Sequence, residues 1–381
     1  MRVKLKDIFD LQMGKTPSRS NLEYWNTTDY KWISIADLTK TSKYIFETKE
    51  YLSKSAIKDS GIKVIPANTV VMSFKLSIGK TAITKEDMYS NEAIMAFKDK
   101  HVINILPEYI FYLFKYKNWE EGSNKAVMGK TLNKATLSEI EVEICSIEKQ
   151  RQIVSILDKI MSSVDGRKQE LQLLDELIKA RFVEVFGDIN INDKNWECEF
   201  LGNLCTIVRG GSPRPIEKFL GGDVPWIKIG DATEADNIYL SSTKEHIIKE
   251  GVKNSRLVKE GSLIFANCGV SLGFARIITF DGCIHDGWLA MEDIDKRLDK
   301  VFLLQALNQM TGHFRAIAPA GTQPNLNTAI MKAYKQVIPP IELQKEFIRF
   351  VHQVNKSKVA VQKALDETQI LFDSLMQKYF G

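Results

Sequence analysis

The sequence has few of the residues on which disulfide frameworks and metal centres depend. Its 381 residues include 5 Cys and 5 His, and no two cysteines follow a Cys-x-x-Cys spacing. An odd, unspaced set of cysteines speaks against a disulfide framework and against a structural zinc site. Because there is also no His-Glu-x-x-His and no histidine pair at i, i+4, the sequence predicts no metal site.

Long apolar runs are missing as well. No stretch approaches the roughly 18 apolar residues of a membrane span, and residues 1–6 alternate charged and apolar side chains, unlike a signal peptide. The net charge is only +4, so a nucleic-acid-binding surface would have to be a local patch. We expect a cytoplasmic protein of two or three domains, with thiols in the reduced state.

Nucleotide and cofactor signatures are absent too. Gly-Lys-Thr occurs at Gly14, Gly79 and Gly129, but the glycine that a P-loop needs five positions earlier is missing each time. No Gly-x-Gly-x-x-Gly follows a predicted strand, and the sequence lacks the Asn/Asp-Pro-Pro-Tyr/Phe signature of base methyltransferases. The sequence therefore predicts no catalytic residue.

One segment matches a catalytic motif. Gly269–Gly273 has the Gly-x-Ser-x-Gly pattern of a nucleophile elbow, with Ser271 as the nucleophile. An elbow needs a helix after the serine, whereas residues 274–280 are β-branched and predict a strand. A hairpin turn is the favoured interpretation, and a serine hydrolase, which a fluorophosphonate probe would label, stays as an alternative.

What the sequence does contain is two long helical patterns, at residues 146–187 and 340–381. Apolar residues recur in alternating steps of four and three, which is the a/d spacing of a coiled coil. The stripes consist of Ile153, Leu157, Ile160, Val164, Leu171, Leu174, Ile178 and Val185, and of Phe347, Val351, Val354, Val361, Leu365, Phe372, Leu375 and Tyr379. Polar interruptions at Arg167, Arg181, Lys358 and Thr368 restrict register and partner. We expect these two helices to pair with each other.

The two helical stretches are copies related by an offset of 194 residues. The same offset relates Trp32–Asp37 (Trp-Ile-Ser-Ile-Ala-Asp) to Trp226–Asp231 (Trp-Ile-Lys-Ile-Gly-Asp), and an offset of 196 relates Gly14–Pro17 to Gly210–Pro213. A shared pattern of this length indicates a tandem duplication.

Each half predicts a mixed α/β domain followed by its helix. The expected domains are 1–145 and 197–339, the helices 146–187 and 340–381, and a polar linker 188–196 joins the halves. Predicted strands include 70–74, 140–144, 226–229, 263–266, 276–278 and 335–338, predicted helices 107–115 and 300–310, and a predicted turn 221–223. The expected fold class is α/β (mixed α+β), with two duplicated globular domains separated by two long helices.

Three pairs of matched loops carry small, amide and cationic residues. They are 15–20 with 209–214, 75–80 with 267–271, and 125–134 with 321–327. Arg and Lys suit phosphates and guanine edges, and Asn and Gln suit adenine. The candidate DNA-binding residues are Lys15, Arg19, Lys75, Lys80, Lys130, Lys134, Arg209, Arg214, Arg276, Gln323, Asn325 and Asn327. Ordinary solvated turns are the alternative at each single position.

The pattern resembles the specificity subunit of Type I restriction-modification enzymes. The resemblance rests on the Gly-x-Ser/Thr-Pro opening and the Trp-Ile-x-Ile-x-Asp block of each half, on Gly321–Asn327 and on Ile338–Gln344 (Ile-Pro-Pro-Ile-Glu-Leu-Gln), which leads into a long helix. It covers nearly the whole chain, twice. The first half departs from it at residues 143–146, which lack the two prolines, and at 129–133, a shortened loop.

The resemblance implies two target-recognition domains, an antiparallel helix pair and a bipartite DNA target with one half-site for each domain. It implies no cofactor in this chain, but two modification (methyltransferase) subunits carrying S-adenosylmethionine and restriction subunits using ATP and Mg²⁺. Residues expected to bind these partners lie at the helix starts: Glu148, Gln150, Glu342 and Gln344.

The length of the two helices is expected to set the spacer between the two halves of the DNA target, as a ruler would. About 40 residues at ~1.5 Å each span about 60 Å, enough to separate two domains over roughly one DNA turn of ~34 Å. Four residues inserted in one helix, about 6 Å, should lengthen the spacer of the target by one to two base pairs. A duplicated coiled-coil scaffold or adaptor without DNA contact is the alternative, and it would be favoured if charge reversal at Arg209 and Arg214 left DNA binding unchanged.

Overall fold

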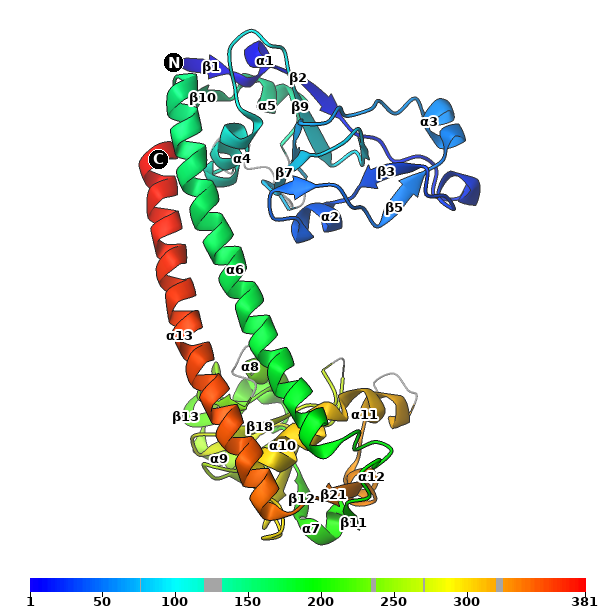
Figure 1. The fold of residues 1–381 in the computed structure, drawn as a ribbon, viewed down its shortest axis with the longest axis vertical. Coiled ribbons are helices and arrows are strands. Elements are labelled where there is room, and N and C mark those ends of the chain that lie inside the picture. Colours follow the sequence, from blue (N-terminus) through cyan, green and yellow to red (C-terminus); the bar gives the residue numbers. More distant parts are fainter. Residues whose placement is uncertain (76, 120–131, 234–237, 270, 320–324) are drawn as a thin grey trace. The chain divides into compact units, whose positions relative to one another are not determined.

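The computed structural model describes residues 1–75, 77–119, 132–233, 238–269, 271–319 and 325–381 (Figure 1). The chain divides into two compact units. Unit 1 is Met1–Lys168 with Lys363–Gly381, and unit 2 is Gln169–Gln362. Each unit contains one globular domain and one half of each long helix. Within the described ranges, no helix combines the length and apolarity that crossing a membrane requires.

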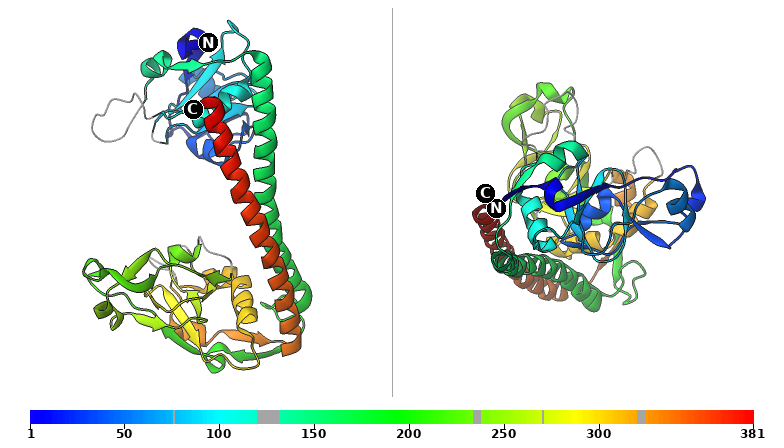
Figure 2. Two further views of the ribbon diagram at one scale, coloured as in Figure 1. Left: turned by 90° about the vertical axis from the view of Figure 1, so that its left-hand side faces the viewer. Right: turned by 90° about the horizontal axis from the view of Figure 1, so that it is seen from above.

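The predicted helices are α6 (Ile147–Phe186) and α13 (Ile341–Phe380), of 40 residues each. In unit 1 the first half of α6 lies beside the last half of α13, and in unit 2 the order is reversed (Figures 1 and 2). Leu157 and Phe372 share one core in unit 1, while the rings of Phe186 and Phe347 lie 5.3 Å apart in unit 2. The helices therefore pair antiparallel in both units, which confirms the predicted pairing.

Polar residues within the apolar stripes pair across the two helices. In unit 1, Arg167 donates a hydrogen bond to the hydroxyl of Thr368. In unit 2, Lys358 Nζ lies 2.7 Å from Asp175 Oδ1. Because each polar group would be costly to leave without its partner, these two contacts favour a single register of α6 against α13.

The domain of unit 1 contains a five-stranded and a three-stranded sheet, with a separate strand pair next to the helix. The five-stranded sheet has the order β2-β9-β6-β7-β4, the three-stranded sheet β5-β3-β8, and the pair is β1-β10. The strands are β1 Arg2–Lys4, β2 Phe9–Met13, β3 Tyr30–Ile33, β4 Tyr44–Ile45, β5 Glu50–Leu52, β6 Val70–Ser73, β7 Thr81–Thr84, β8 Tyr89–Ser90, β9 Ile94–Asp99 and β10 Glu141–Glu143. The helices are α1 Leu5–Ile8, α2 Ile35–Lys40, α3 Lys54–Ser60, α4 Pro107–Tyr116 and α5 Lys134–Glu139.

The domain of unit 2 repeats this topology. Its five-stranded sheet has the matching order β12-β20-β17-β18-β14, its second sheet β15-β13-β19-β16 gains one edge strand, and β11-β21 is the pair next to the helix. The strands are β11 Glu197–Phe200, β12 Thr206–Arg209, β13 Leu220–Ile227, β14 Tyr239–Leu240, β15 Glu245–Ile247, β16 Arg256–Val258, β17 Leu263–Ala266, β18 Ala275–Ile278, β19 Gly282–Ile284, β20 Trp288–Glu292 and β21 Lys335–Ile338. The helices are α7 Leu201–Leu204, α8 Ile229–Thr233, α9 Lys249–Val252, α10 Lys300–Gln309, α11 Thr311–Ile317 and α12 Thr328–Lys332.

Helices α4 and α10 join each domain to the helix pair. In unit 1, the ring of Phe114 lies 4.7 Å from Phe97 of the sheet, and Tyr112 lies 6.3 Å from Phe372 of α13. In unit 2, Phe302 of α10 stacks on Phe182 of α6 at 5.8 Å. An apolar helix buried on both sides is expected to hold the domain rigidly on its half of the coiled coil.

One predicted turn is wrong. Residues 221–223 lie inside strand β13, where the pairing with β15 shifts between Leu220 and Val224. Gly221 has a φ of +84°, so the glycine permits a bulge instead of a chain reversal. Strand β13 also ends at Ile227, before the predicted end at residue 229, because Ile229 begins α8.

Candidate nucleic-acid interface

The Gly-x-Ser/Thr-Pro turn of unit 1 is fixed to the ends of strands β8 and β9. The backbone N–H of Gly14 donates to Ile94 O at 3.1 Å, and that of Lys15 donates to Ser90 O at 2.8 Å. A Cβ atom at Gly14 would lie 2.2 Å from Asn91 O. Only glycine therefore permits this approach of two backbones.

The same turn in unit 2 makes the same bonds. Gly210 N–H donates to Trp288 O at 2.9 Å and Gly211 N–H donates to Ile284 O at 3.0 Å. A Cβ atom at Gly210 would lie 2.1 Å from His285 O. The acceptors of the two turns, 94 with 288 and 90 with 284, differ by the repeat offset of 194, so the duplication extends to individual hydrogen bonds.

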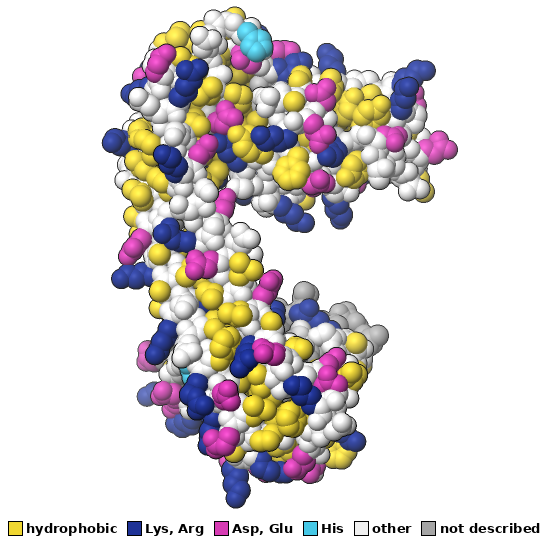
Figure 3. Space-filling model, in the orientation of Figure 1, with side chains coloured by type: hydrophobic (Ala, Val, Ile, Leu, Met, Phe, Trp, Pro, Cys, Tyr) yellow, Lys and Arg dark blue, Asp and Glu magenta, His cyan; other side chains and the backbone are white. Residues whose placement is uncertain are grey.

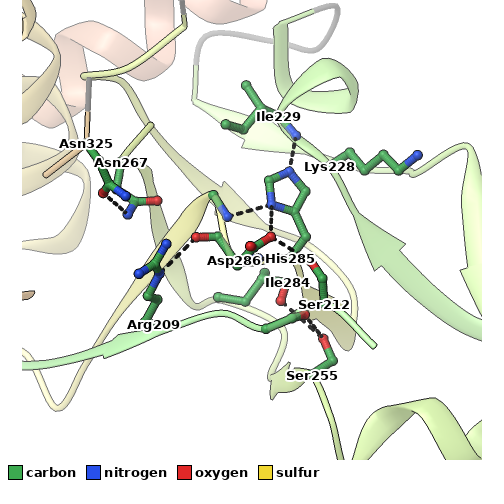
Figure 4. Close-up of polar contacts among 12 residues, drawn as sticks. Arg209, Ser212, Lys228, Ile229, Ser255, Asn267, Ile284, His285, Asp286 and Asn325 are labelled. Carbon is green, nitrogen blue, oxygen red and sulfur yellow. Dashed lines mark hydrogen bonds and ion pairs between the residues drawn. The ribbon is translucent and has the colours of Figure 1, made fainter. Parts of the chain in front are cut away.

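The hydroxyl of each turn binds a carboxylate on the facing segment. Thr16 donates to Glu92 Oε2 in unit 1, and Ser212 Oγ donates to Asp286 Oδ1 at 2.6 Å in unit 2 (Figure 4). The hydrogen bond from Thr16 lowers the pKa of Glu92. Burial acts to raise the pKa of Asp286, but the bond from Ser212, the charge of His285, the backbone N–H of Asp286 and the charge of Arg214 together outweigh it, so this pKa lies below its usual value. Both carboxylates are therefore ionised at neutral pH.

Two cations of the first loop in unit 1, Arg19 and Lys15, each have a partner of their own. The guanidinium of Arg19 lies 3.7 Å above the ring of Trp25 and pairs with Glu50, Nη2 to Oε2 at 3.1 Å. Lys15 donates from Nζ to Ser60 O. A guanidinium stacked on a tryptophan and held by a carboxylate has little rotamer freedom left to lose on binding a ligand.

Two arginines flank the carboxylate in unit 2. Arg209, at the end of β12, donates from Nε to the backbone oxygen of Asp286 at 3.0 Å (Figure 4). Arg214 is 79% exposed, and its Nη2 lies 3.7 Å from Asp286 Oδ2. Both guanidinium groups keep donors that can serve a phosphate or a guanine edge.

The other loop candidates are placed as follows. Lys75 and Lys80 lie in the turn between β6 and β7, with Lys80 exposed. Lys134 begins α5 and is exposed. Lys130 and Gln323 lie outside the described residues.

The amides have structural partners. Asn325 Oδ1 accepts from Asn267 Nδ2 at 3.1 Å (Figure 4), which joins the third loop of unit 2 to the second. Asn327 Oδ1 accepts from the backbone N–H of Ile330 at 2.9 Å and caps α12. Each amide oxygen is thus already bonded, so the amide N–H groups are what these residues can offer to a base.

The expectation for Arg276 does not fit its position. This residue lies within strand β18 with only 8% of its surface exposed, and its Nη1 donates to Ala275 O at 2.8 Å. Its guanidinium lies 4.7 Å from the ring of Phe274. The strand pattern places Arg276 on a covered face of the sheet, which removes it from a surface that could contact DNA directly.

The expectation for the two glutamines at the helix starts also needs correction. Gln150 and Gln344 are fully buried. Gln344 accepts from the backbone N–H of Asp299 at 2.8 Å and donates to the carbonyls of Arg297 and Pro339. These side chains bind the domain to its helix, so they cannot face a partner subunit. Glu148 and Glu342, two positions earlier, are exposed.

The hydrolase interpretation of Ser271 lacks the required backbone. The segment after Gly273 is strand β18, Ala275–Ile278, where an elbow needs a helix. Within the described ranges, no group of three or more His, Cys, Asp or Glu side chains is placed to hold a metal ion.

Charge is distributed evenly on the surface shown in Figure 3. Lys and Arg side chains alternate with Asp and Glu over each unit, in keeping with a net charge of +4. The expectation that a DNA-binding surface is a local patch stays a prediction.

Comparison with known proteins identifies the family. The sequence profile of the Type I restriction modification DNA specificity domain matches residues 1–176 and again residues 193–368. The chain belongs to this family. It is a specificity subunit of the Type I restriction-modification class and thus a non-catalytic component.

Relatives of this specificity subunit agree with the assignment. The chain is 25% identical to the Type I restriction enzyme MjaIX specificity subunit of Methanocaldococcus jannaschii over 400 aligned positions, which cover 98% of this chain and 91% of the relative. It is 26% identical over 171 positions to the EcoR124I/EcoR124II specificity subunit of Escherichia coli, covering 42% of this chain and 41% of the relative.

Solved structures share its fold. The Type I restriction-modification S subunit from M. genitalium has a TM-score of 0.55 at 14% identity, over 100% of this chain and 96% of that chain. A chain from a study of complex assembly and conformational transition of the type I R-M system has a TM-score of 0.62 at 16% identity, over 100% of this chain and 97% of that chain.

Proposed function

We propose that this specificity subunit reads a bipartite DNA target, with one half-site for each domain. The observation that carries the proposal is the repetition of one hydrogen-bonded turn in two domains, at Gly14–Pro17 and Gly210–Pro213, each with its own cations. Two similar domains on an antiparallel helix pair suit two opposed half-sites. The residues around the turns differ between the domains, so the two half-sites are expected to differ in sequence.

The proposed partners are double-stranded DNA, two modification subunits that carry S-adenosylmethionine, and restriction subunits that use ATP and Mg²⁺. Exposed apolar side chains on α6 and α13 support docking on the helices, since large apolar residues at a surface mark interaction sites. They are Ile156, Leu173, Leu177, Val183, Val359, Ile370 and Leu371. Glu148 and Glu342 stay candidates for polar contacts with these partners.

Sequencing of modified bases in cells with and without this chain tests the proposal. We expect a split motif, two short defined sequences separated by an unspecified spacer, to be methylated only when the chain is present. An unsplit motif, or the same methylation in its absence, would contradict the proposal.

The arginines of the second domain give a more local prediction. Replacing both Arg209 and Arg214 with Gln should weaken DNA binding by the assembled complex about tenfold, and should reduce the slope of log affinity against log salt by about two, since two phosphate contacts are lost. The measurement is a salt titration of binding. Lys259→Gln is the control, because Lys259 is 75% exposed but pairs with Asp281 away from the turn.

The adaptor alternative makes the opposite prediction. A chain that only holds other subunits together would keep the same affinity and the same salt slope in the double arginine variant. An unchanged titration would therefore favour the adaptor.

A further inference from the structure

Each domain places one carboxylate among the cations of its first loop. Glu92 and Asp286 are related by the repeat offset of 194, and each accepts a hydrogen bond from the hydroxyl of its turn, Thr16 or Ser212. Glu92 is exposed and the side chain of Asp286 is 46% exposed. The two carboxylates therefore occupy equivalent positions at the surface.

One oxygen of each carboxylate is held and the other is available. Ser212 binds Oδ1 of Asp286, while the nearest cation to Oδ2 is Arg214 at 3.7 Å, longer than a hydrogen bond. Thr16 binds Oε2 of Glu92, and within the described residues no other side chain donates a hydrogen bond to this carboxylate. Each carboxylate thus presents a fixed acceptor toward solvent.

A negative charge is unfavourable in a loop that approaches phosphates. A neutral amide could accept the same hydroxyl hydrogen bond and would not repel DNA. The acid is nevertheless present in both copies, although the side chain is Glu in one domain and Asp in the other. A hydrogen bond that only fixes the turn does not require an acid at this position. A direct contact between the carboxylate and a base does require it.

The hydrogen-bonding groups on the base edges limit which base a carboxylate can contact. An ionised carboxylate only accepts hydrogen bonds, and its usual partner in the major groove is the N4 amino group of cytosine. On the same base pair, guanine O6 and N7 accept from an arginine or lysine. Arg214 Nη2 lies 3.7 Å from Asp286 Oδ2, and the positive charges of Lys75 and Arg19 act on Glu92 without a direct ion pair. A carboxylate with a cation in the same region complements the donor and acceptors of a C·G pair.

We propose that Glu92 and Asp286 are specificity-determining residues, each accepting a hydrogen bond from the exocyclic amine of a cytosine in one half of the target. This inference rests on the proposed bipartite reading of DNA. It assigns one cytosine to each half-site, read by the carboxylate that faces the first loop of each domain.

The test uses the chain assembled with its methyltransferase partner and duplexes that carry the motif found by sequencing. Each cytosine of the motif is replaced in turn by a pyrimidinone that lacks the N4 amine. For the unmodified chain, we expect about tenfold weaker binding at one cytosine in each half. If no cytosine in either half depends on its amine, the inference is wrong, and this arm does not depend on any variant folding.

Variants then assign the residues. Asp286→Ala, which removes the acceptor, should abolish the amine dependence in one half only, and Glu92→Ala in the other half only. Ser212→Ala removes the hydroxyl that holds Asp286 but keeps the carboxylate, so the amine dependence should remain. If Ser212→Ala and Asp286→Ala have the same effect, or if Asp286→Ala alters both halves, the carboxylates only hold the turns and the inference is overturned. A target that is not split in the unmodified protein would instead contradict the proposed function.

Discussion

Replacing Gln344 with alanine is expected to lower the free energy of unfolding of unit 2 by about 3 kcal/mol or more. The side chain is fully buried and bonds three backbone groups, Asp299 N–H at 2.8 Å, Arg297 O at 2.8 Å and Pro339 O at 2.7 Å. Truncation leaves all three without partners, and a buried unsatisfied group costs about 1–3 kcal/mol. Asp299 is the N-cap residue of α10, so the loss also loosens the helix that joins the domain to the coiled coil.

The duplication supplies an independent repeat of this experiment. In unit 1, Gln150 accepts from Leu106 N–H at 2.9 Å and donates to Asn104 O and Cys145 O at 3.2 and 3.0 Å. Leu106 is the N-cap residue of α4. Gln150→Ala should therefore destabilise unit 1 to a similar extent.

Matched controls lie on the same helices. Gln353 on α13 and Gln152 on α6 are exposed, and their replacement by alanine should change stability by no more than about 0.5 kcal/mol. Denaturant titration that follows each unit separately provides the measurement. Equal effects for Gln344→Ala and Gln353→Ala would show that the buried hydrogen bonds do not hold the domain to its helix.

Lengthening both helices by four residues, between 168 and 169 and between 362 and 363, is expected to lengthen the spacer of the target by one to two base pairs. Four residues add about 6 Å and about 40° of rotation to a helix. One base pair adds ~3.4 Å and about 34° to DNA. The added length and the added rotation of the helices both correspond to one to two base pairs of DNA. Each domain should therefore still face the groove of its half-site.

The structure revises the insertion in a single helix that the sequence suggests. Both helices must be lengthened together, since the contacts Arg167–Thr368 and Lys358–Asp175 set their register within each unit. The control inserts four residues at Ile191, which is 70% exposed in the turn after α6, and should leave the spacer unchanged. Sequencing of modified bases reads the spacer directly. An unchanged spacer after lengthening both helices would refute the proposed ruler.

The sequence predicts periodic features of this protein best. An a/d stripe determines which face of a helix is covered, so α6 and α13 are predicted to within one residue at each end, and the offset of 194 predicts two domains of one topology. The bulge at Gly221 escapes prediction because one glycine permits either a turn or a bulge, and pairing with β15 decides between them.

Single polar residues are harder to interpret. Gln150 and Gln344 are equivalent polar residues at helix starts, which predicts an exposed partner surface. Their equivalence instead reflects identical buried bonds to the backbone, which no sequence pattern distinguishes. Glu92 and Asp286 are acidic, so the pattern of cations and amides that suggests DNA contacts does not include them. The offset of 194 nevertheless relates these two acids, and a comparison of acidic residues across the repeat points to them.

The most direct test of one half-site for each domain is a chain in which residues 1–145 also replace residues 197–339, with both helices kept. Modified bases are then sequenced in cells that contain this chain and its methyltransferase partner. We predict an inverted repeat of the half-site read by the first domain, with the second half-site lost. Methylation of the original asymmetric motif by this chain would contradict the account.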